Sequence, residues 1–452
     1  MSGTPSTVAD GPANRRRPIA AWLFLVAFAV YALTMSRTLW TTDVYGANWT
    51  SWHIVTTGSP WIDGARIPDV GHRSTELLAI VHTHGGHTAF GRFPGVVAAT
   101  LPAYVLLGSG AMSIVPGSLT AALLTAGALT LLFLALRRSL TERQALLAVV
   151  LFGFTTPVWT VSANLMWPQT LTVLGIAGMA WASATGRWWW AGVFGGIALW
   201  GRVHAAIIVA VLGLAVGLRR RDPGIVLRIG LTSGAFLAAS CAWIHWVYGT
   251  WNPLGAYDTG TVGANADAYR FSISNQLGMW VSPDRGLLVW TPLVLLLLPA
   301  LVRSWSSLPD WSRSLLVGGL VYTVLGGALN TFTGGDGFYG YRYGLELLAS
   351  ATPALALSHR RMGRVERVLF GPVAAVQAFA FLLGGLYENL YLSQTVAWHQ
   401  NAFVHALDRI GPAGWVVTAL VALVGFLVGR RFSRVTGPTR VAGDRTVDEV
   451  SV

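Results

Sequence analysis

The chain contains 452 residues, of which 53% are hydrophobic and only 11% are charged, and its mean hydropathy is +0.54. Soluble globular proteins carry roughly 25% charged residues, so this chain has too few to cover a water-facing surface of its size. The composition excludes a soluble enzyme, a disordered chain and a nucleic-acid-binding protein, in spite of the net charge of +12. We therefore expect a polytopic membrane protein.

Apolar runs of about 20 residues, the length that crosses a bilayer, recur along the chain. The predicted spanning helices are 19–36, 117–136, 144–161, 168–186, 226–248, 286–302, 314–331, 344–358, 368–386 and 413–429. With this assignment one side of the membrane receives the arginines at 137–138, 143, 187, 219–221, 228, 303, 313, 360–361, 364, 367 and 430–431. Such a one-sided excess of basic residues is typical of cytoplasmic connections.

Two segments are ambiguous. Residues 93–112 have the length of a spanning helix, but Pro94 and Pro102 favour a broken or re-entrant element. Residues 188–218 carry Arg202 near their middle, which is compatible with a hairpin of two short helices or with one long tilted helix. In the hairpin, Arg202 would lie near the outer side of the membrane.

The predicted fold is an all-α polytopic membrane protein with about 11–13 transmembrane helices and a long first extracytoplasmic loop. Residues 19–432 form a single transmembrane domain between flexible cytoplasmic tails, 1–18 and 433–452. Extracytoplasmic loops are expected near 37–92, 249–285, 332–343 and 387–412. Long loops are often functional, so we expect the chemistry on the outer face.

Asp43 follows the first predicted helix closely and has Trp40, Trp49 and Trp52 around it in the sequence. A carboxyl group held among aromatic rings at the membrane interface could have a raised pKa and act as a general base. The alternative is an ordinary solvated aspartate in a loop. On position in the sequence alone, the solvated aspartate is the favoured interpretation.

Histidines are concentrated at His82, His84 and His87, and imidazoles can bind zinc. Their spacing matches no closed metal site, whereas 77–82 and 88–93 have the pattern of two short strands around a Gly-Gly turn. We therefore predict a β-hairpin whose histidines do not bind metal.

On the predicted outer side, four arginines are in unusual settings: Arg92, Arg202, Arg285 and Arg342. Charges at membrane depth are costly and suggest function, and guanidinium groups suit phosphate recognition. The alternative is a side chain that reaches the interface or pairs with a nearby carboxylate, as Arg285 could pair with Asp284. Function is favoured most for Arg202 and Arg342.

Three segments resemble the GT-C superfamily of polyprenyl-phosphate-sugar-dependent glycosyltransferases. They are Thr-Thr-Asp-Val-Tyr at 41–45, the stretch from His87 to Gly108 with Arg-Phe-Pro-Gly, and the motifs at 277–292 and 334–344. The resemblance covers approximately residues 40–110 and 249–345 of this chain. Val44 stands where many members have a second acidic residue, and Arg92 stands where relatives often have lysine.

The resemblance implies an inverting transfer of a hexose or pentose at the outer face of the plasma membrane. The donor would be a sugar linked to a polyprenyl phosphate, and the acceptor a cell-envelope glycan, lipid or protein. Asp43 would act as the general base, without a cofactor; a divalent metal is disfavoured because Val44 replaces the second acidic residue. Donor phosphate binding is assigned to Arg202, Arg285, Arg342 and Arg92. Substrate binding is assigned to Tyr45, Trp52, His204, Asp336 and Tyr341.

Two other classes of protein share this composition. A transporter or flippase of a lipid-linked saccharide would also use arginines within the membrane, but it would favour an internal repeat. A noncatalytic membrane scaffold would not require clustered outer arginines. The long first loop with Asp43 favours the transferase.

Overall fold

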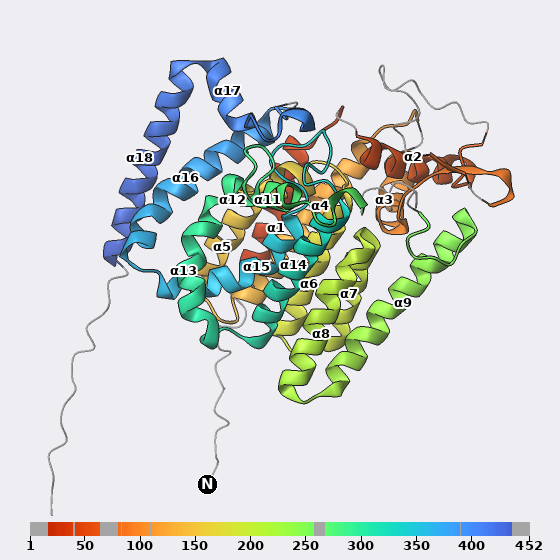
Figure 1. Cartoon of the computed structure of the whole chain (residues 1–452), viewed down its shortest axis with the longest axis horizontal. Coiled ribbons are helices and arrows are strands. Elements are labelled where there is room, and N and C mark those ends of the chain that lie inside the picture. The colour runs from red at the N-terminus through yellow and green to blue at the C-terminus, as the bar shows by residue number, and fades with distance from the viewer. Residues whose placement is uncertain are drawn as a thin grey trace, which may run out of the picture.

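The structure is a computed structural model that describes residues 17–38, 41–63, 80–82, 84–108, 110–256, 267–388 and 390–435. The described part is helical apart from one short β-hairpin (Figure 1). Most of the two predicted tails, and parts of the predicted loops 37–92 and 249–285, lie outside the described residues, as does Trp40.

The N-terminal half begins with one apolar helix, continues through the helix and hairpin of the first loop, and then forms a series of packed helices. Its elements are α1 (Arg17–Thr34), α2 (Thr42–Thr57), β1 (Ile80–His82), β2 (Thr88–Phe90), α3 (Pro94–Leu107), α4 (Val115–Leu136), α5 (Glu142–Phe154), α6 (Pro168–Ala184), α7 (Trp188–Gly201), α8 (Ala206–Arg220) and α9 (Pro223–Tyr248).

The C-terminal half contains long and short helices, and two of the short ones lie in the predicted outer loops. Its elements are α11 (Ile273–Val281), α12 (Leu287–Trp290), α13 (Pro292–Ser304), α14 (Asp310–Leu329), α15 (Leu345–Ser358), α16 (Arg364–Leu386), α17 (Ala402–Ile410) and α18 (Pro412–Val435).

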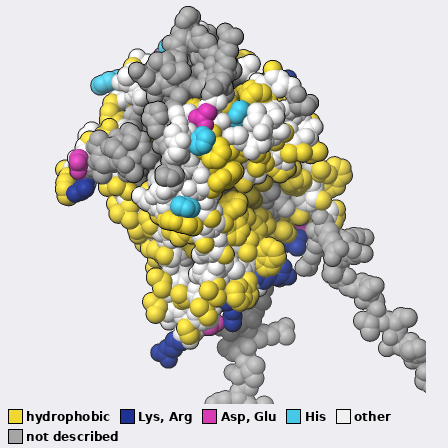
Figure 2. Space-filling view, turned by 90° about the vertical axis from the view of Figure 1, so that its right-hand side faces the viewer, with side chains coloured by type: hydrophobic (Ala, Val, Ile, Leu, Met, Phe, Trp, Pro, Cys, Tyr) yellow, Lys and Arg dark blue, Asp and Glu magenta, His cyan; other side chains and the backbone are white. Residues whose placement is uncertain are grey.

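Six helices in the described ranges are long and apolar enough to cross a membrane by length and composition: α4, α8 with its preceding turn, α9, α14, α16 and α18. Shorter apolar helices occur at 18–34, 94–107 and 292–307. Figure 2 shows hydrophobic side chains over much of the visible face. The predicted class, an all-α polytopic membrane protein, is confirmed, and the number of crossings stays a prediction.

Prolines break two of the predicted spanning helices. The segment 144–161 is not one helix, because α5 ends at Phe154 and a π-helical turn, Val158–Ser162, follows Pro157. The segment 286–302 is divided into α12 and α13 at Pro292, the first residue of α13. Proline has no amide hydrogen and cannot continue the hydrogen bonding of the preceding helix, so each break occurs beside one.

The two ambiguous segments are also settled by the structure. Arg202 lies between α7 and α8, so the hairpin is confirmed and a single long helix is wrong. Residues 94–107 form one helix, α3, with Pro102 inside it, so the segment is not broken there. At 1.5 Å per residue this helix of 14 residues is about 21 Å long, shorter than a bilayer core.

The predicted β-hairpin is confirmed. Strands β1 and β2 are antiparallel, with His82 opposite Thr88 and Ile80 opposite Phe90. The turn between them contains Gly85 and Gly86, with φ of 82° and 84°, a backbone conformation that glycine adopts without steric cost.

Helix α15 lies at the centre of the helical body, between α6, α13 and α14 (Figure 1). Nearly every residue from Leu345 to Leu355 is buried. A helix that is apolar on all sides is stable only when other helices surround it. Its N-terminal end therefore holds the preceding loop, 330–344, against the protein interior.

The connections predicted to be cytoplasmic meet at one end of the molecule. Arg360 Nη2 donates a hydrogen bond to the Ser139 carbonyl oxygen at 3.0 Å, and Arg303 Nε donates to the Arg361 carbonyl oxygen at 3.0 Å. These contacts join the α4–α5, α13–α14 and α15–α16 connections. We call this end the arginine-rich end.

Helices α16 and α18 pack with their backbones in close contact. A Cβ atom added at Gly371 would lie 2.1 Å from the Gly425 carbonyl oxygen, whereas one added at Gly230 on α9 would meet no atom within 4 Å. We expect Gly371→Ala to destabilise the protein by about 1–3 kcal/mol through overpacking, and Gly230→Ala to leave stability unchanged or slightly raised. Thermal unfolding in detergent measures both, and equal melting temperatures would contradict the packing.

Candidate active site

Asp43 lies in the first turn of α2. Thr41 precedes the helix, and its hydroxyl accepts a hydrogen bond from the Val44 amide at 3.5 Å, which orients the chain at the start of the helix. The helix packs on α3, where the hydroxyls of Ser51 and Thr100 lie 2.7 Å apart. The Asp43 side chain therefore projects from a supported helix, and it is 40% exposed.

Two arginines from distant parts of the chain approach the Asp43 carboxylate. Arg342 Nη1 donates a hydrogen bond to Asp43 Oδ2 at 2.6 Å. Arg92 Nη2 lies 3.8 Å from Asp43 Oδ1, and Arg92 Nε donates to the Asp43 carbonyl oxygen at 3.1 Å. The structure thus brings together three of the predicted site residues, two of them 299 positions apart.

These arginines determine the pKa of Asp43. Burial by itself would raise the pKa, but the charges of Arg342 and Arg92, with the hydrogen bond from Arg342, outweigh burial and lower the pKa from 3.8 to about 2. The raised pKa expected from the neighbouring tryptophans is therefore wrong, because guanidinium groups face the carboxylate. Asp43 is ionised at neutral pH and has little tendency to accept a proton while both arginines hold it.

Aromatic rings surround the Arg342 guanidinium group, which is 8% exposed. Its central carbon lies 4.6 Å from the ring centre of Trp167, 5.1 Å from that of Tyr343 and 5.7 Å from that of Phe338. Contacts between a cation and aromatic rings are attractive and replace part of the lost hydration. Arg342 is thereby held in place beside Asp43.

Arg202 belongs to the same cluster through Tyr343. Its guanidinium carbon lies 4.7 Å from the Tyr343 ring centre, and its Nη1 lies 3.4 Å from the Tyr322 hydroxyl and 3.9 Å from Glu346 Oε1. The Glu346 side chain is fully buried and accepts a hydrogen bond from Thr172 at 3.1 Å. A buried carboxylate beside Arg202 offsets the cost of placing a charge at this depth.

A cavity of about 180 Å³ borders this cluster. Its polar wall includes Arg202, His204, Asn330 and Tyr343, and its apolar wall includes Ile207, Met279, Leu325 and Leu329. Leu325 is 45% exposed on α14, one of the candidate membrane-spanning helices. The cavity therefore suits an amphipathic ligand with a polar group beside Arg202 and a hydrocarbon part toward α8 and α14. We call it the Arg202 cavity.

The charges of the cluster do not cancel. The guanidinium groups of Arg92, Arg202 and Arg342 carry three positive charges, and Asp43 and Glu346 supply at most two negative ones. An excess of positive charge in a partly buried site favours an anion, and arginine side chains have the geometry to bind phosphate oxygens.

Arg285 lies against Phe338, with its guanidinium carbon 4.5 Å from the ring centre that Arg342 also approaches, but it contacts neither Asp43 nor the Arg202 cavity in the described residues. Its side chain is almost fully buried, with Nη1 2.7 Å from Asp284 Oδ2 and 3.2 Å from the Gly340 carbonyl oxygen, and Nη2 2.9 Å from the Leu392 carbonyl oxygen. These bonds join three loops of the outer end. The pairing with Asp284 matches the alternative to a functional role, so we leave Arg285 out of the proposed donor site.

Asp336 and Tyr341 also serve the packing of these loops. Asp336 Oδ1 accepts a hydrogen bond from the backbone amide of Gln394 at 2.6 Å. Tyr341 is buried, and its hydroxyl lies 3.2 Å from Thr291 Oγ1, on the interior side of the loop that carries Arg342. Neither side chain lines the Arg202 cavity.

The other predicted substrate-binding residues have different positions. His204 lines the Arg202 cavity. Tyr45 is buried with its ring against the edge of Phe90. Trp52 donates from Nε1 to the Gly110 carbonyl oxygen at 3.0 Å, which anchors α2 to the α3–α4 connection.

Of the three histidines in the hairpin segment, His87 forms a hydrogen-bonded contact at the surface. His87 Nδ1 lies 2.5 Å from Asp63 Oδ2, and its ring is stacked on Trp61 at 4.5 Å. Within the described ranges, no three His, Cys, Asp or Glu side chains lie close enough together to hold a metal ion. The metal independence of the reaction stays a prediction.

Comparison with solved structures identifies the fold. ArnT from Cupriavidus metallidurans in the apo state matches with a TM-score of 0.51 and 14% identity, over 91% of this chain and 72% of ArnT. The same protein bound to undecaprenyl phosphate matches with a TM-score of 0.48 and 14% identity, over 91% of this chain and 75% of ArnT. The Archaeoglobus fulgidus oligosaccharyltransferase with a tethered acceptor peptide matches with a TM-score of 0.48 and 12% identity. The match covers 90% of this chain and 55% of the oligosaccharyltransferase.

No family model and no curated protein matches the sequence. ArnT and the oligosaccharyltransferase are both GT-C glycosyltransferases. The similarity to apo ArnT confirms the predicted GT-C-like fold, and at this identity it shows the fold alone.

The Asp43–Arg342 contact can be tested with a double-mutant cycle. We expect Asp43→Asn and Arg342→Gln to show a coupling of about 1 kcal/mol in stability, since the carboxylate is partly exposed. Because the pKa of Asp43 is lowered in the folded protein, this stabilisation is present above the unfolded pKa of 3.8 and is lost as the pH falls toward 2. Unfolding measured between pH 5 and 8 should therefore give constant coupling, and zero coupling would contradict the ion pair.

Proposed function

We propose that this protein transfers a sugar from a polyprenyl-phosphate-linked donor to a cell-envelope glycan, lipid or protein at the outer face of the plasma membrane, with inversion. The observation that carries the proposal is the cluster of Asp43, Arg92, Arg342 and Arg202 beside an amphipathic cavity. The GT-C-like fold supports the same class of reaction. ArnT has been crystallised with undecaprenyl phosphate, a ligand of the type that this cavity suits.

In this proposal the donor phosphate binds at Arg202, Arg92 and Arg342. The negative phosphate pairs with Arg342 and Arg92, so these arginines stabilise the Asp43 carboxylate less. The pKa of the Asp43 carboxyl group therefore rises toward its ordinary value. Asp43 then accepts the proton of the acceptor hydroxyl as that oxygen forms a bond to the anomeric carbon of the sugar. The bond from the anomeric carbon to the phosphate oxygen breaks, and polyprenyl phosphate leaves with its charge held by the arginines.

The first test removes the base. Asp43→Asn should abolish transfer in proteoliposomes supplied with polyprenyl-phosphate hexoses and pentoses and with extracted envelope lipids and glycans as acceptors. Loss of a general base costs typically 10²–10⁴-fold in rate. Asp267→Asn, which changes an aspartate that is 83% exposed, is the matched control and should retain full activity. Equal activity of Asp43→Asn and the control would refute the role of Asp43.

The second test concerns the phosphate. Arg202→Ala and Arg92→Ala should each weaken binding of undecaprenyl phosphate about tenfold or more, since a hydrogen bond to a charged group is worth about 1.5–3 kcal/mol. Arg270→Ala, at an arginine that is 57% exposed, is the control and should bind normally. Native mass spectrometry of protein titrated with undecaprenyl phosphate measures the affinity.

A transport assay distinguishes the proposed transferase from the rival function, a flippase. A flippase of lipid-linked saccharides would move a fluorescent polyprenyl-phosphate sugar across proteoliposomes at the same rate in wild-type protein and in Asp43→Asn, with no glycosylated acceptor formed. Unaltered undecaprenyl phosphate affinity in both arginine variants would contradict the assignment of the donor site.

A further inference from the structure

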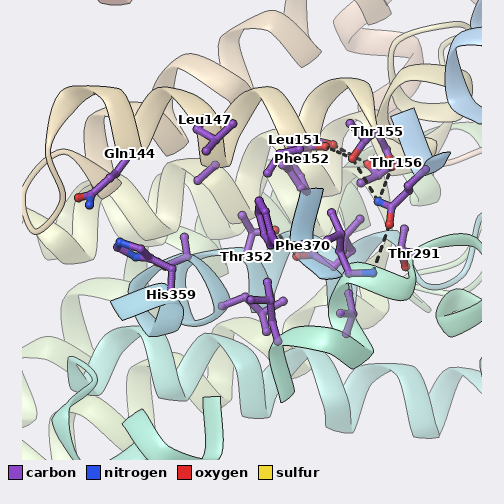
Figure 3. A pocket seen from close by; sticks show the side chains of 18 of the residues that line it. Gln144, Leu147, Leu151, Phe152, Thr155, Thr156, Thr291, Thr352, His359 and Phe370 are labelled. Atoms are coloured by element: carbon purple, nitrogen blue, oxygen red, sulfur yellow. Dashed lines mark hydrogen bonds between the residues drawn. The ribbon is translucent and has the colours of Figure 1, made fainter. Parts of the chain in front are cut away.

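A second cavity lies in the helical body, between α5, α13, α15 and α16, and has a volume of about 200 Å³ (Figure 3). Its wall is mainly apolar and includes Leu151, Phe152, Leu297, Leu355 and Phe370. It shares no lining residue with the Arg202 cavity. We call it the α5–α15 cavity.

Polar groups at the inner end of this cavity already have partners within the protein. Gln377 Nε2 donates to the Thr155 carbonyl oxygen at 2.6 Å, and Gln377 Oε1 accepts from the Leu293 amide at 3.3 Å. Thr291 Oγ1 donates to the Leu287 carbonyl oxygen at 2.5 Å. A water molecule in a cavity needs free polar partners, and an empty apolar cavity loses packing energy. Hydrocarbon is therefore the content that the wall favours.

The opposite end of the cavity lies at the arginine-rich end. Gln144 and His359 lie there, well separated from Thr155, Thr156 and Thr291 at the inner end (Figure 3). Leu147 lines the cavity on α5 and is 53% exposed, so that side of the wall faces the surroundings of the helical bundle.

The connections at this end are strongly basic. The charged residues in 137–144 and 359–367, together with the one that ends α13, are Arg137, Arg138, Glu142, Arg143, Arg360, Arg361, Arg364, Glu366, Arg367 and Arg303. Arg303 pairs with Glu366, and Arg143, Arg360 and Arg364 are exposed. A negatively charged group at the entrance of the cavity would be strongly attracted.

We propose that the α5–α15 cavity binds an acyl chain of an anionic phospholipid, with the phosphate of the head group at the arginine-rich end. Apolar lining favours the chain, and the exposed arginines favour a negatively charged head group over a zwitterionic one. The bound chain fills space against α15, the helix whose N-terminal end supports the loop of Arg342. The lipid is thus a structural ligand, distinct from the proposed sugar donor at the other end of the protein.

Native mass spectrometry of delipidated protein tests this assignment. Phosphatidylglycerol should be retained at least fivefold more than phosphatidylcholine with identical chains, and Leu151→Trp should abolish the difference by filling the cavity. Leu420→Trp, on the exposed side of α18, is the matched control and should retain lipid as the wild type does. Equal retention of the two lipids, or unchanged retention in Leu151→Trp, would overturn the proposal.

A measurement on the wild-type protein avoids dependence on the folding of Leu151→Trp. Phosphatidylglycerol with a photoreactive diazirine near the end of one chain should label α5 and α15, and excess undecaprenyl phosphate should not reduce this labelling. Labelling confined to the outer surfaces of α16 and α18 would refute the site. Displacement by undecaprenyl phosphate would also refute it, because the cavity would then take a polyprenyl chain.

Discussion

The contact between Asp43 and Arg342 is the interaction on which the arrangement of the site depends. A guanidinium group that is almost completely buried is stable only if its charge is compensated. Asp43 supplies the compensation from the first turn of α2, and Arg342 belongs to the loop before α15. The pair therefore joins the first loop of the chain to the central helix, and the elements that carry Arg92 and Arg202 pack around this junction.

The same contact creates a chemical requirement. A carboxylate with a pKa of about 2 is a poor acceptor of protons, and a general base works best when its pKa is near the ambient pH. In the proposed reaction the donor phosphate supplies the missing negative charge to the arginines and releases the carboxylate. Activation of the base would then depend on prior occupation of the donor site.

The sequence was informative where the residue type itself is unusual in a membrane protein. Asp43, Arg202 and Arg342 were recognisable because charges are rare in this chain, and the breaks at Pro157 and Pro292 have a local cause that a hydropathy window does not register. Arg285 was noticeable for the same reason, but its contacts favour a structural role over phosphate binding. Its charge is compensated by Asp284, the residue immediately before it, and its remaining bonds go to backbone carbonyl groups that no sequence pattern reveals.

Tertiary contacts supplied the rest of the site. Tyr343 lies between two arginines, Glu346 faces Arg202, and Trp167 covers Arg342, yet Trp167 is far in the sequence from the other two. Only the position of Tyr343 beside Arg342 offered a signal in the sequence. The fold class was predictable from composition because the bilayer imposes it on any such chain, whereas side-chain partners depend on how the helices pack.

In the proposed donor complex, a polyprenyl phosphate binds with its phosphate at the arginine cluster and its hydrocarbon between α8 and α14. Photolabelling with a polyprenyl phosphate that carries a diazirine in its first isoprene unit, followed by peptide mapping, measures this directly. We expect labelled residues in α8, α11 and α14 around the Arg202 cavity, and less labelling when unlabelled undecaprenyl phosphate is added. Labelling in α5 and α13, or labelling that the competitor does not reduce, would contradict this donor complex.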